Sequence, residues 1–289
     1  MVLGTHNRRR FLIAAALIAG ALLIAGCGGS SPVKTVSLVR AAYVSSKAPG
    51  YKMTATETIT VAGKTIDANL SGSFIPAAHE GSMSAQLAFP STSGPSPQRY
   101  QINYILTNDT FYMQMPASFA SKLPGGKRWI VMNLDQIARA AKLPGFGSLM
   151  SDTSTLNDPG QYLDFLRATA AGSVKNLGQQ TINGIQTTHY QAEIDYAKLP
   201  NAVPAADRSG MEQLVAALEK RGDASNTPVD VWIDKSDLIR QLQTTSNETV
   251  KGKAVSLVLD EDFIEYGPQP VPTVPDASQT TNLLSLIHR

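Results

Sequence analysis

Few side chains in this sequence have the type and spacing that catalysis needs. The four histidines are His6, His79, His189 and His288, and no two are close enough along the chain to suggest a pair of metal ligands. The chain has no H-E-x-x-H, no G-x-S-x-G and no glycine-rich loop for a phosphate or dinucleotide. His189 falls on the polar side of an expected strand, which favours a surface histidine. We therefore expect a protein that is not an enzyme and has no metal or cofactor.

The acidic residues also favour a protein without a catalytic or metal site. Asp260-Glu261-Asp262 lacks the glycine and the ligand spacing of a calcium loop. Strand alternation sends its members to opposite faces, so we interpret it as a charged strand edge. Asp230 and Asp234 share one strand face, where two exposed carboxylates without partners form no acid–base pair. A hydrolase built from Asp230, His189 and a serine that converge in space stays open as a third hypothesis.

Cys27 is the one residue whose context predicts a defined modification. It ends the segment Ile24-Ala25-Gly26-Cys27, which resembles a bacterial lipobox, and it is the only cysteine. The segment closes an apolar run, residues 11–25, that follows three arginines and is shorter than the roughly 20 residues of a membrane-spanning helix. We expect residues 1–26 to be a lipoprotein signal peptide, Cys27 to carry the lipid, and residues 27–34 to be a flexible tether. A plain signal peptide is the alternative.

The expected location is the cell membrane, with the protein lipid-anchored on its extracytoplasmic side. Arg8-Arg9-Arg10-Phe11-Leu12 resembles a twin-arginine export signal, but ordinary signals are also rich in arginine, so both export routes stay open. Of the 25 basic and 23 acidic residues, three basic and no acidic ones lie in residues 1–26, which leaves 22 against 23 and a net charge of −1. A net charge of −1 gives no sign of the basic surface that nucleic-acid binding needs, so we expect no nucleic-acid partner.

Period-two alternation of apolar and polar residues dominates the rest of the chain. It predicts about eleven strands, at residues 51–61, 64–74, 81–89, about 100–106, 110–115, 127–132, 174–182, 185–195, 228–234, 238–248 and 254–266. Asn183-Gly184 is a strong hairpin signal. Helical spacing and caps predict helices at residues 35–46, 133–144, 158–172 and 209–221. The expected fold class is α+β, with a single large curved antiparallel sheet over residues 35–266 and helices on one face. A proline-rich tail, residues 267–289, should run over the surface and dock through its apolar end.

The apolar side of the first strands is rich in methionine and aromatic residues. Such a set is typical of a core, but also of an adaptable small-molecule pocket. A sheet of eleven strands has more inner face than a few short helices can cover, so we expect a cavity there. The expected lining residues are Met53, Leu70, Phe74, Met83, Leu87, Phe89, Ile102, Tyr104, Phe111, Met113 and Met115.

Several segments resemble actinobacterial lipoproteins of the LppX/LprG type, which are relatives of the LolA and LolB lipoprotein carriers. The resemblance rests on the lipobox, on residues 126–134, on residues 183–190 and on residues 228–234. It implies a LolA-like half-barrel whose helices cover the concave face around a hydrophobic cavity. It also implies binding and transport of an acylated lipid or lipoprotein across the cell envelope, with the periplasm as the compartment.

Two non-catalytic hypotheses follow. The first is a membrane-tethered carrier, anchored through lipidated Cys27, that binds a lipid or acylated protein and works with a membrane exporter. The second is an envelope module that senses stray lipid or lipoprotein and regulates a membrane partner. Neither needs a cofactor.

Overall fold

The first half of the fold is an antiparallel meander in which each strand pairs with the one before it. Its strands are β1 (Tyr51–Val61), β2 (Lys64–Ile75), β3 (Glu80–Phe89), β4 (Gln98–Thr107), β5 (Thr110–Gln114) and β6 (Trp129–Asn133). The computed structural model describes residues 36–91, 96–107, 110–120, 123–133, 166–169, 172–203, 205, 208–221, 226–250 and 253–287, all within the unit Pro32–Arg289. The strand prediction for this half is confirmed.

The second half is another meander, which begins at the opposite edge of the sheet and ends at its centre. It consists of β7 (Lys175–Ile182), β8 (Ile185–Ile194), β9 (Thr227–Asp234), β10 (Ile239–Val250) and β11 (Lys253–Tyr266). Asn183 and Gly184 take φ values of 48° and 81°, as a type I′ hairpin turn requires, so the hairpin prediction is confirmed.

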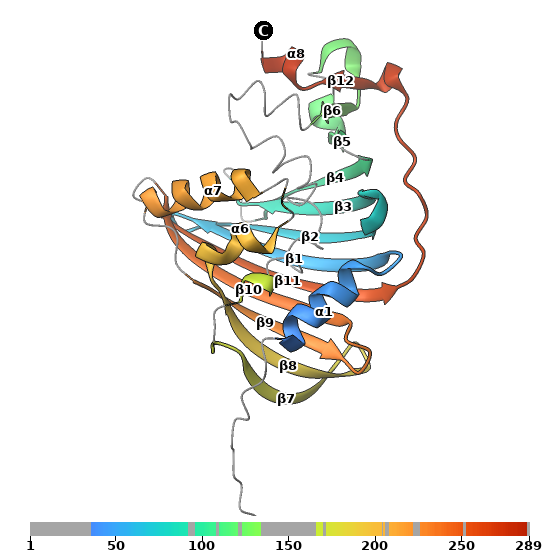
Figure 1. Cartoon of the computed structure of the whole chain (residues 1–289). Helices are drawn as coiled ribbons and strands as arrows, with labels where there is room; N and C mark the ends of the chain where they lie inside the picture. Colours follow the sequence, from blue (N-terminus) through green and yellow to red (C-terminus); the bar gives the residue numbers. More distant parts are fainter. Residues whose placement is uncertain are drawn as a thin grey trace, which may run out of the picture. The chain divides into compact units, whose positions relative to one another are not determined.

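The two meanders join where β11 pairs with β1. The result is one curved sheet with the strand order β12-β6-β5-β4-β3-β2-β1-β11-β10-β9-β8-β7 (Figure 1). The predicted α+β class with one large curved sheet is therefore confirmed. The Asp260-Glu261-Asp262 strand was expected at an edge, but β11 lies between β1 and β10 at the centre of the sheet. That expectation was wrong.

The twelfth strand was not predicted. After β11, residues 267–276 run without helix or strand to β12 (Thr280–Asn282), which pairs in parallel with β6 (Figure 1). The backbone N–H of Leu283 donates to the carbonyl of Val131 at 3.0 Å, and helix α8 (Leu284–Ile287) follows. The tail thus docks on the far edge of the sheet, and it makes the sheet mixed rather than purely antiparallel.

The helices α1 (Val36–Ser46), α6 (Leu199–Ala202) and α7 (Arg208–Arg221) lie on one face of the sheet, here called the inner face (Figure 1). The predicted helices at residues 35–46 and 209–221 are confirmed. The remaining short elements are α2 (Ala117–Ala120), η1 (Pro76–Ala78), η2 (Pro124–Gly126), η4 (Leu166–Ala168), η5 (Tyr196–Lys198) and η6 (Ala277–Gln279). The predicted helix at 133–144 falls outside the described residues except for Asn133, which ends β6. The signal peptide, Cys27, the tether and most of the predicted helix at 158–172 also lie outside them.

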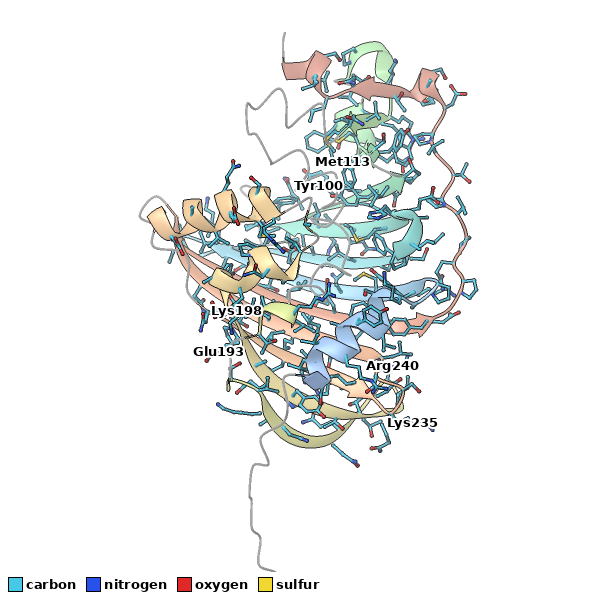
Figure 2. The ribbon with its side chains drawn as sticks, in the orientation of Figure 1. Tyr100, Met113, Glu193, Lys198, Lys235 and Arg240 are labelled. Atoms are coloured by element: carbon cyan, nitrogen blue, oxygen red, sulfur yellow. The ribbon has the colours of Figure 1, made fainter. Side chains whose placement is uncertain are left out.

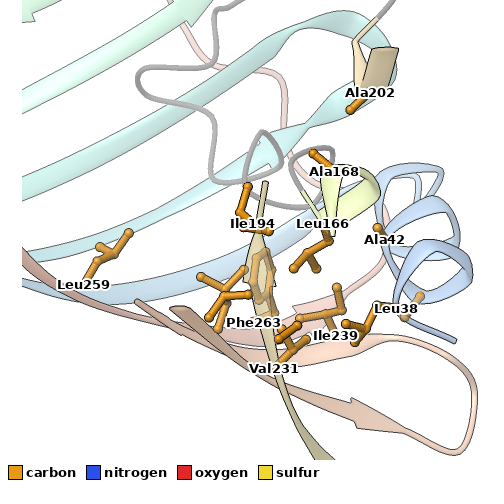
Figure 3. Packing of buried hydrophobic residues seen from close by; sticks show 14 of the residues in the cluster. Leu38, Ala42, Leu166, Ala168, Ile194, Ala202, Val231, Ile239, Leu259 and Phe263 are labelled. Carbon is orange, nitrogen blue, oxygen red and sulfur yellow. The ribbon is translucent and has the colours of Figure 1, made fainter. Parts of the chain in front are cut away.

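The main core lies between these helices and the sheet. Leu38 of α1 and Leu166 of η4 are fully buried, and they pack with Val231, Ile239 and Phe263 of the sheet (Figure 3). Fully burying a side chain of this size contributes about 1.5–3 kcal/mol, so this cluster fixes α1 and η4 on the inner face.

Two predictions about which side chains face the core were wrong. The helical spacing of Val36, Val39, Ala42 and Tyr43 in the sequence favours these residues as the stripe through which α1 packs, but Tyr43 is 54% exposed. The helix is apolar on more than one side, so periodicity alone did not identify the stripe that the core selects. In β6, the alternation of residues 127–132 in the sequence favours Trp129 and Val131 as the inward residues, whereas Ile130 is buried and pairs with Met113.

Candidate ligand site

The register brings the ten predicted lining residues that lie in β1 to β5 to the inner face, and Met115 follows directly after the end of β5. Opposite residues on antiparallel strands share a face, and the pairs run Met53↔Gly72↔Met83↔Tyr104↔Met113 across five strands. The neighbouring rows contain Leu70, Ile102, Leu87, Phe74 and Phe111 on the same side. Figure 2 shows Tyr100 and Met113 in this part of the sheet.

Most of this region is packed. Met53, Phe74, Met83 and Phe111 are buried, and the other predicted lining residues are half-buried. Tyr104 stacks on Phe111 with ring centroids 5.3 Å apart. The void that Phe74, Met83, Tyr104 and Phe111 help to line has a volume of about 10 Å³, and such a space accommodates one water at most. That these residues contact a ligand stays a prediction.

A larger cavity lies in the other half of the sheet. Its volume is about 210 Å³ and it shares no residue with the predicted set. Strands β8 to β11 form its floor, and η4, η5 and α6 contribute its other walls. It is lined by Leu166, Ile194, Tyr196, Leu199, Thr227, Val229, Leu242, Thr244, Ser246 and Leu257.

The chemistry of this cavity is apolar. None of its lining residues is charged, and its polar groups are hydroxyls. The Tyr196 hydroxyl lies 2.9 Å from Oγ1 of Thr227, and Thr244 Oγ1 donates to the carbonyl of Pro228 at 2.9 Å. These hydroxyls are already hydrogen-bonded within the chain, so a ligand need not supply partners for them. The cavity therefore suits a hydrocarbon group.

The wall formed by η4 is fixed by hydrogen bonds to the end of β8. The N–H of Asp195 donates to the carbonyl of Ala168 at 2.9 Å, and the ammonium of Lys198 donates to the carbonyl of Thr169 at 3.1 Å (Figure 2). The hydroxyl of Thr169 donates to the carbonyl of Leu166. These contacts hold Leu166 over the sheet, so the cavity has an ordered wall on this side.

An apolar row connects the cavity with the first half of the sheet. Leu257, at one side of the cavity, pairs with Ile59, which pairs in turn with Ile66. In the next row along the strands, Glu57 lies on the inner face, where it pairs with Leu259 and Ala68. Burial raises the pKa of the Glu57 carboxyl. The pKa of Tyr104 is also raised, first by burial and then by the charge of Glu57.

The acidic residues of Asp260-Glu261-Asp262 in β11 point to opposite faces of the sheet, as expected. Glu261 is on the inner face and 4% exposed, and it pairs with Ala55 and Leu242. Asp260, on the outer face, accepts hydrogen bonds from Gln241 at 2.9 Å and Gln243 at 3.3 Å. Burial, followed by the charge of Asp260, raises the pKa of Asp262, while a hydrogen bond from Asn183 lowers it.

His189 is not a free surface histidine. Its Nε2 lies 2.7 Å from Oδ1 of Asp230, and its ring stacks on Trp232 with centroids 4.2 Å apart. The Trp232 indole N–H donates to Oε1 of Gln180 at 2.7 Å. The expectation that Asp230 and Asp234 have no partners was also wrong, because Arg240 Nη2 lies 2.7 Å from Oδ2 of Asp234.

The histidine pair lies on the face opposite the cavity, since Asp230 and Trp232 alternate with the inward Val229 and Val231. We interpret it as a structural contact between β8 and β9. Across the described ranges, no group of three or more His, Cys, Asp or Glu side chains is arranged to hold a metal ion. Within those ranges, no helix has the length and hydropathy to cross a membrane.

Sequence reasoning identified the correct face but not the cavity. Alternation in residues 228–234 and 254–266 does place Val229 and Leu257 on the inner side. The signal that was missing is the segment around Leu166, whose position over β8 depends on tertiary contacts.

Comparison with known proteins finds no family model that matches this chain. An uncharacterized 31.2 kDa protein of Streptomyces griseus, from the rplA-rplJ intergenic region, is 30% identical over 181 residues. The match covers 62% of this chain and 55% of that protein, so the chain spans about half the length of the curated relative it matches.

Solved structures of two mycobacterial proteins are similar to this one. LprF from Mycobacterium bovis is 14% identical with a TM-score of 0.38, and the match covers 85% of this chain and 99% of LprF. The lipoprotein LppX from Mycobacterium tuberculosis is 15% identical with a TM-score of 0.37, and the match covers 85% of this chain and all of LppX. LppX, to which the sequence segments show a resemblance, is thus among the proteins of similar structure.

Proposed function

We propose that this chain is a membrane-anchored lipoprotein that binds the apolar chain of a lipid or an acylated protein and carries it across the cell envelope. The observation behind the proposal is the cavity of about 210 Å³, which has apolar walls and no charged lining residue. An apolar cavity of about 150 Å³ stays dry and binds benzene in water. A cavity somewhat larger than that suits the end of an acyl chain.

The energetics fit a carrier that needs no catalysis. Each methylene that leaves water for the cavity contributes about 0.8 kcal/mol. The same methylene gains a similar amount in a bilayer, so exchange between bilayer and protein is nearly balanced. The direction of transfer then depends on the next acceptor or on a membrane partner, such as an exporter.

The rest of a long ligand has a path along the sheet. Pockets that bind drug-sized ligands generally have volumes of about 300–1,000 Å³, which is more than this cavity provides. The row Leu257–Ile59–Ile66 leads from the cavity toward the predicted lining residues of β2 to β5. We propose that the chain end occupies the cavity and that the remainder lies along this row.

Two neighbouring residues of β11 give a matched test. Leu257 lines the cavity, whereas Val258 is 37% exposed and follows it on the same strand. Leu257→Trp should fill the cavity and weaken binding of the fluorescent fatty acid 11-(dansylamino)undecanoic acid at least tenfold, while Val258→Trp leaves the affinity within twofold. Equal affinity for both variants would argue against the cavity as the site.

The membrane anchor is the second part of the proposal. Acylation of Cys27 would hold the protein at the outer surface of the membrane, because two or three acyl chains anchor stably where one does not. The sensing hypothesis shares this anchor and this cavity. It differs in one respect: a sensor retains its lipid while it contacts a regulator, and a carrier releases the lipid to an acceptor membrane.

A further inference from the structure

Helix α1 has two faces of different chemistry. Leu38, Ala41 and Ala42 are at most 1% exposed and pack on the sheet. Arg40 and Tyr43, with Lys47 directly after the helix, point the other way. At about 100° per residue these three side chains fall within a sector of about 60°, opposite the buried set. Tyr43 is 54% exposed, so no described part of the protein covers this outward face.

The outward face and the turn beside it form a basic patch. Helix α1 contains no acidic residue, and the ammonium of Lys47 lies 6.0 Å from the centre of the Tyr43 ring. Arg40 pairs with Asp237 at 2.8 Å, which connects α1 to the β9–β10 turn and its exposed Lys235 (Figure 2). We call Arg40, Tyr43, Lys47 and Lys235 the α1 patch. It carries three positive charges beside the single acid Asp237.

This charge contrasts with the rest of the chain. After residues 1–26, 22 basic residues stand against 23 acidic ones. The nearby Arg240 does not add to the patch, because it pairs with Asp234 at 2.7 Å. With three basic residues and Asp237, the α1 patch keeps a net positive charge in a chain whose overall charge is close to zero.

The tether leads directly to this helix. Val36 begins α1 nine residues after Cys27. A chain of that length spans at most about 32 Å when fully extended. If Cys27 carries the lipid, as the proposed function requires, α1 is the described element nearest to the bilayer along the chain.

From these observations we infer that the α1 patch lies on the anionic surface of the bilayer. Basic side chains are attracted to anionic headgroups, and tyrosine favours the interface because one end is apolar and the other polar. An acyl anchor combined with basic residues holds a protein more firmly than either alone. Because α1 lies on the same face of the sheet as η4 and α6, this orientation turns the cavity side toward the bilayer (Figure 1).

The test uses the full-length lipidated protein in vesicles of phosphatidylcholine and phosphatidylglycerol. Cys27 is the only cysteine and is blocked by its lipid, so an engineered cysteine can be labelled alone with bimane. The reporters are Tyr43→Cys and Lys47→Cys, and the control is Leu177→Cys on edge strand β7, where Leu177 is 48% exposed. Quenching by a headgroup-proximal doxyl lipid reports contact with the bilayer.

The patch predicts at least twofold stronger quenching at both reporter positions than at position 177. Arg40→Glu with Lys235→Glu should reduce the quenching at position 43 at least twofold, and vesicles of phosphatidylcholine alone should do the same. Equal quenching at positions 43 and 177 would overturn the inferred orientation while leaving the anchor intact. Protein that fails to float with the vesicles would overturn the anchor, and the inference with it. Unchanged circular dichroism melting verifies that each variant folds.

Discussion

Tyr51 and Phe263 meet edge to face, with ring centroids 5.3 Å apart, at the junction of the two halves of the sheet. Tyr51 is on the first strand of one meander and Phe263 is on the last strand of the other. Both are at most 1% exposed. A bulge between Lys52 and Met53 shifts the register here so that Phe263 faces Met53. This contact joins the meander that carries the predicted lining residues to the meander that carries most of the cavity's lining.

The first prediction concerns this junction. Phe263→Ala should lower the free energy of unfolding by about 3–5 kcal/mol, because it removes a buried ring and leaves a cavity. Urea denaturation measures the change. Val258→Ala, on the exposed side of the same strand, should change it by less than about 0.5 kcal/mol. Similar losses in both variants would contradict the role of the junction.

The second prediction concerns Gly81, which leaves room for the ring of Phe74 on the neighbouring strand. A Cβ at position 81 would lie 2.3 Å from Cδ1 of Phe74, closer than side chains can approach. Gly81→Ala should therefore displace that ring and cost about 1–3 kcal/mol in unfolding free energy. Ser84→Ala, on the outer side of the same strand, serves as the control. A stable Gly81→Ala variant with unchanged near-ultraviolet circular dichroism would show that this packing is not tight.

The third prediction is a pH dependence at Glu57. Burial raises the pKa of this carboxyl above its ordinary value of 4.5, so the folded chain binds the proton more tightly than the unfolded chain. The resulting stabilisation is fully present below the ordinary pKa and is lost as the pH rises through the raised one. Glu57→Gln should thus be more stable than the parent at pH 7 and equal to it near pH 3.5. Urea midpoints across this range measure the gap, and a gap independent of pH would contradict the assignment.

The fourth prediction concerns the anchor. Cys27→Ser should move the protein from the membrane to the soluble envelope fraction and abolish incorporation of labelled palmitate, since no other cysteine is present. Binding of the dansylated fatty acid by the purified variant should stay within twofold of the parent. Retention of Cys27→Ser protein in the membrane would contradict lipid anchoring at this residue.

Alternation in the sequence predicted the strands well, because each strand has one apolar and one polar side. The positive φ values at Asn183 and Gly184 match the turn that those two residues favour. Strand β12 was missed because Thr280, Thr281 and Asn282 show no such pattern and pair in parallel with a strand far away in the sequence.

The site was only partly predictable. The alternation of side chains along β11 shows which face of the sheet Leu257 occupies, but it does not show which segments pack over that face. The cavity exists because Leu166 and Leu199 stand over β8 to β11, and their position results from tertiary hydrogen bonds such as Asp195 to Ala168. The proximity of His189 and Asp230 entered the sequence analysis only as part of the hydrolase hypothesis, because the contact joins two strands whose neighbourhood the sequence alone does not reveal.

Mass spectrometry of organic extracts tests the central claim most directly. Protein purified from its native membrane, in parent form and as Leu257→Trp and Val258→Trp, would be extracted and its lipids quantified per mole of protein. We expect acylated lipid in the parent and in Val258→Trp, and at least a fivefold reduction in Leu257→Trp. Extracts with no lipid above the level of a control protein, or with equal lipid in the two variants, would contradict a cavity that binds acyl chains.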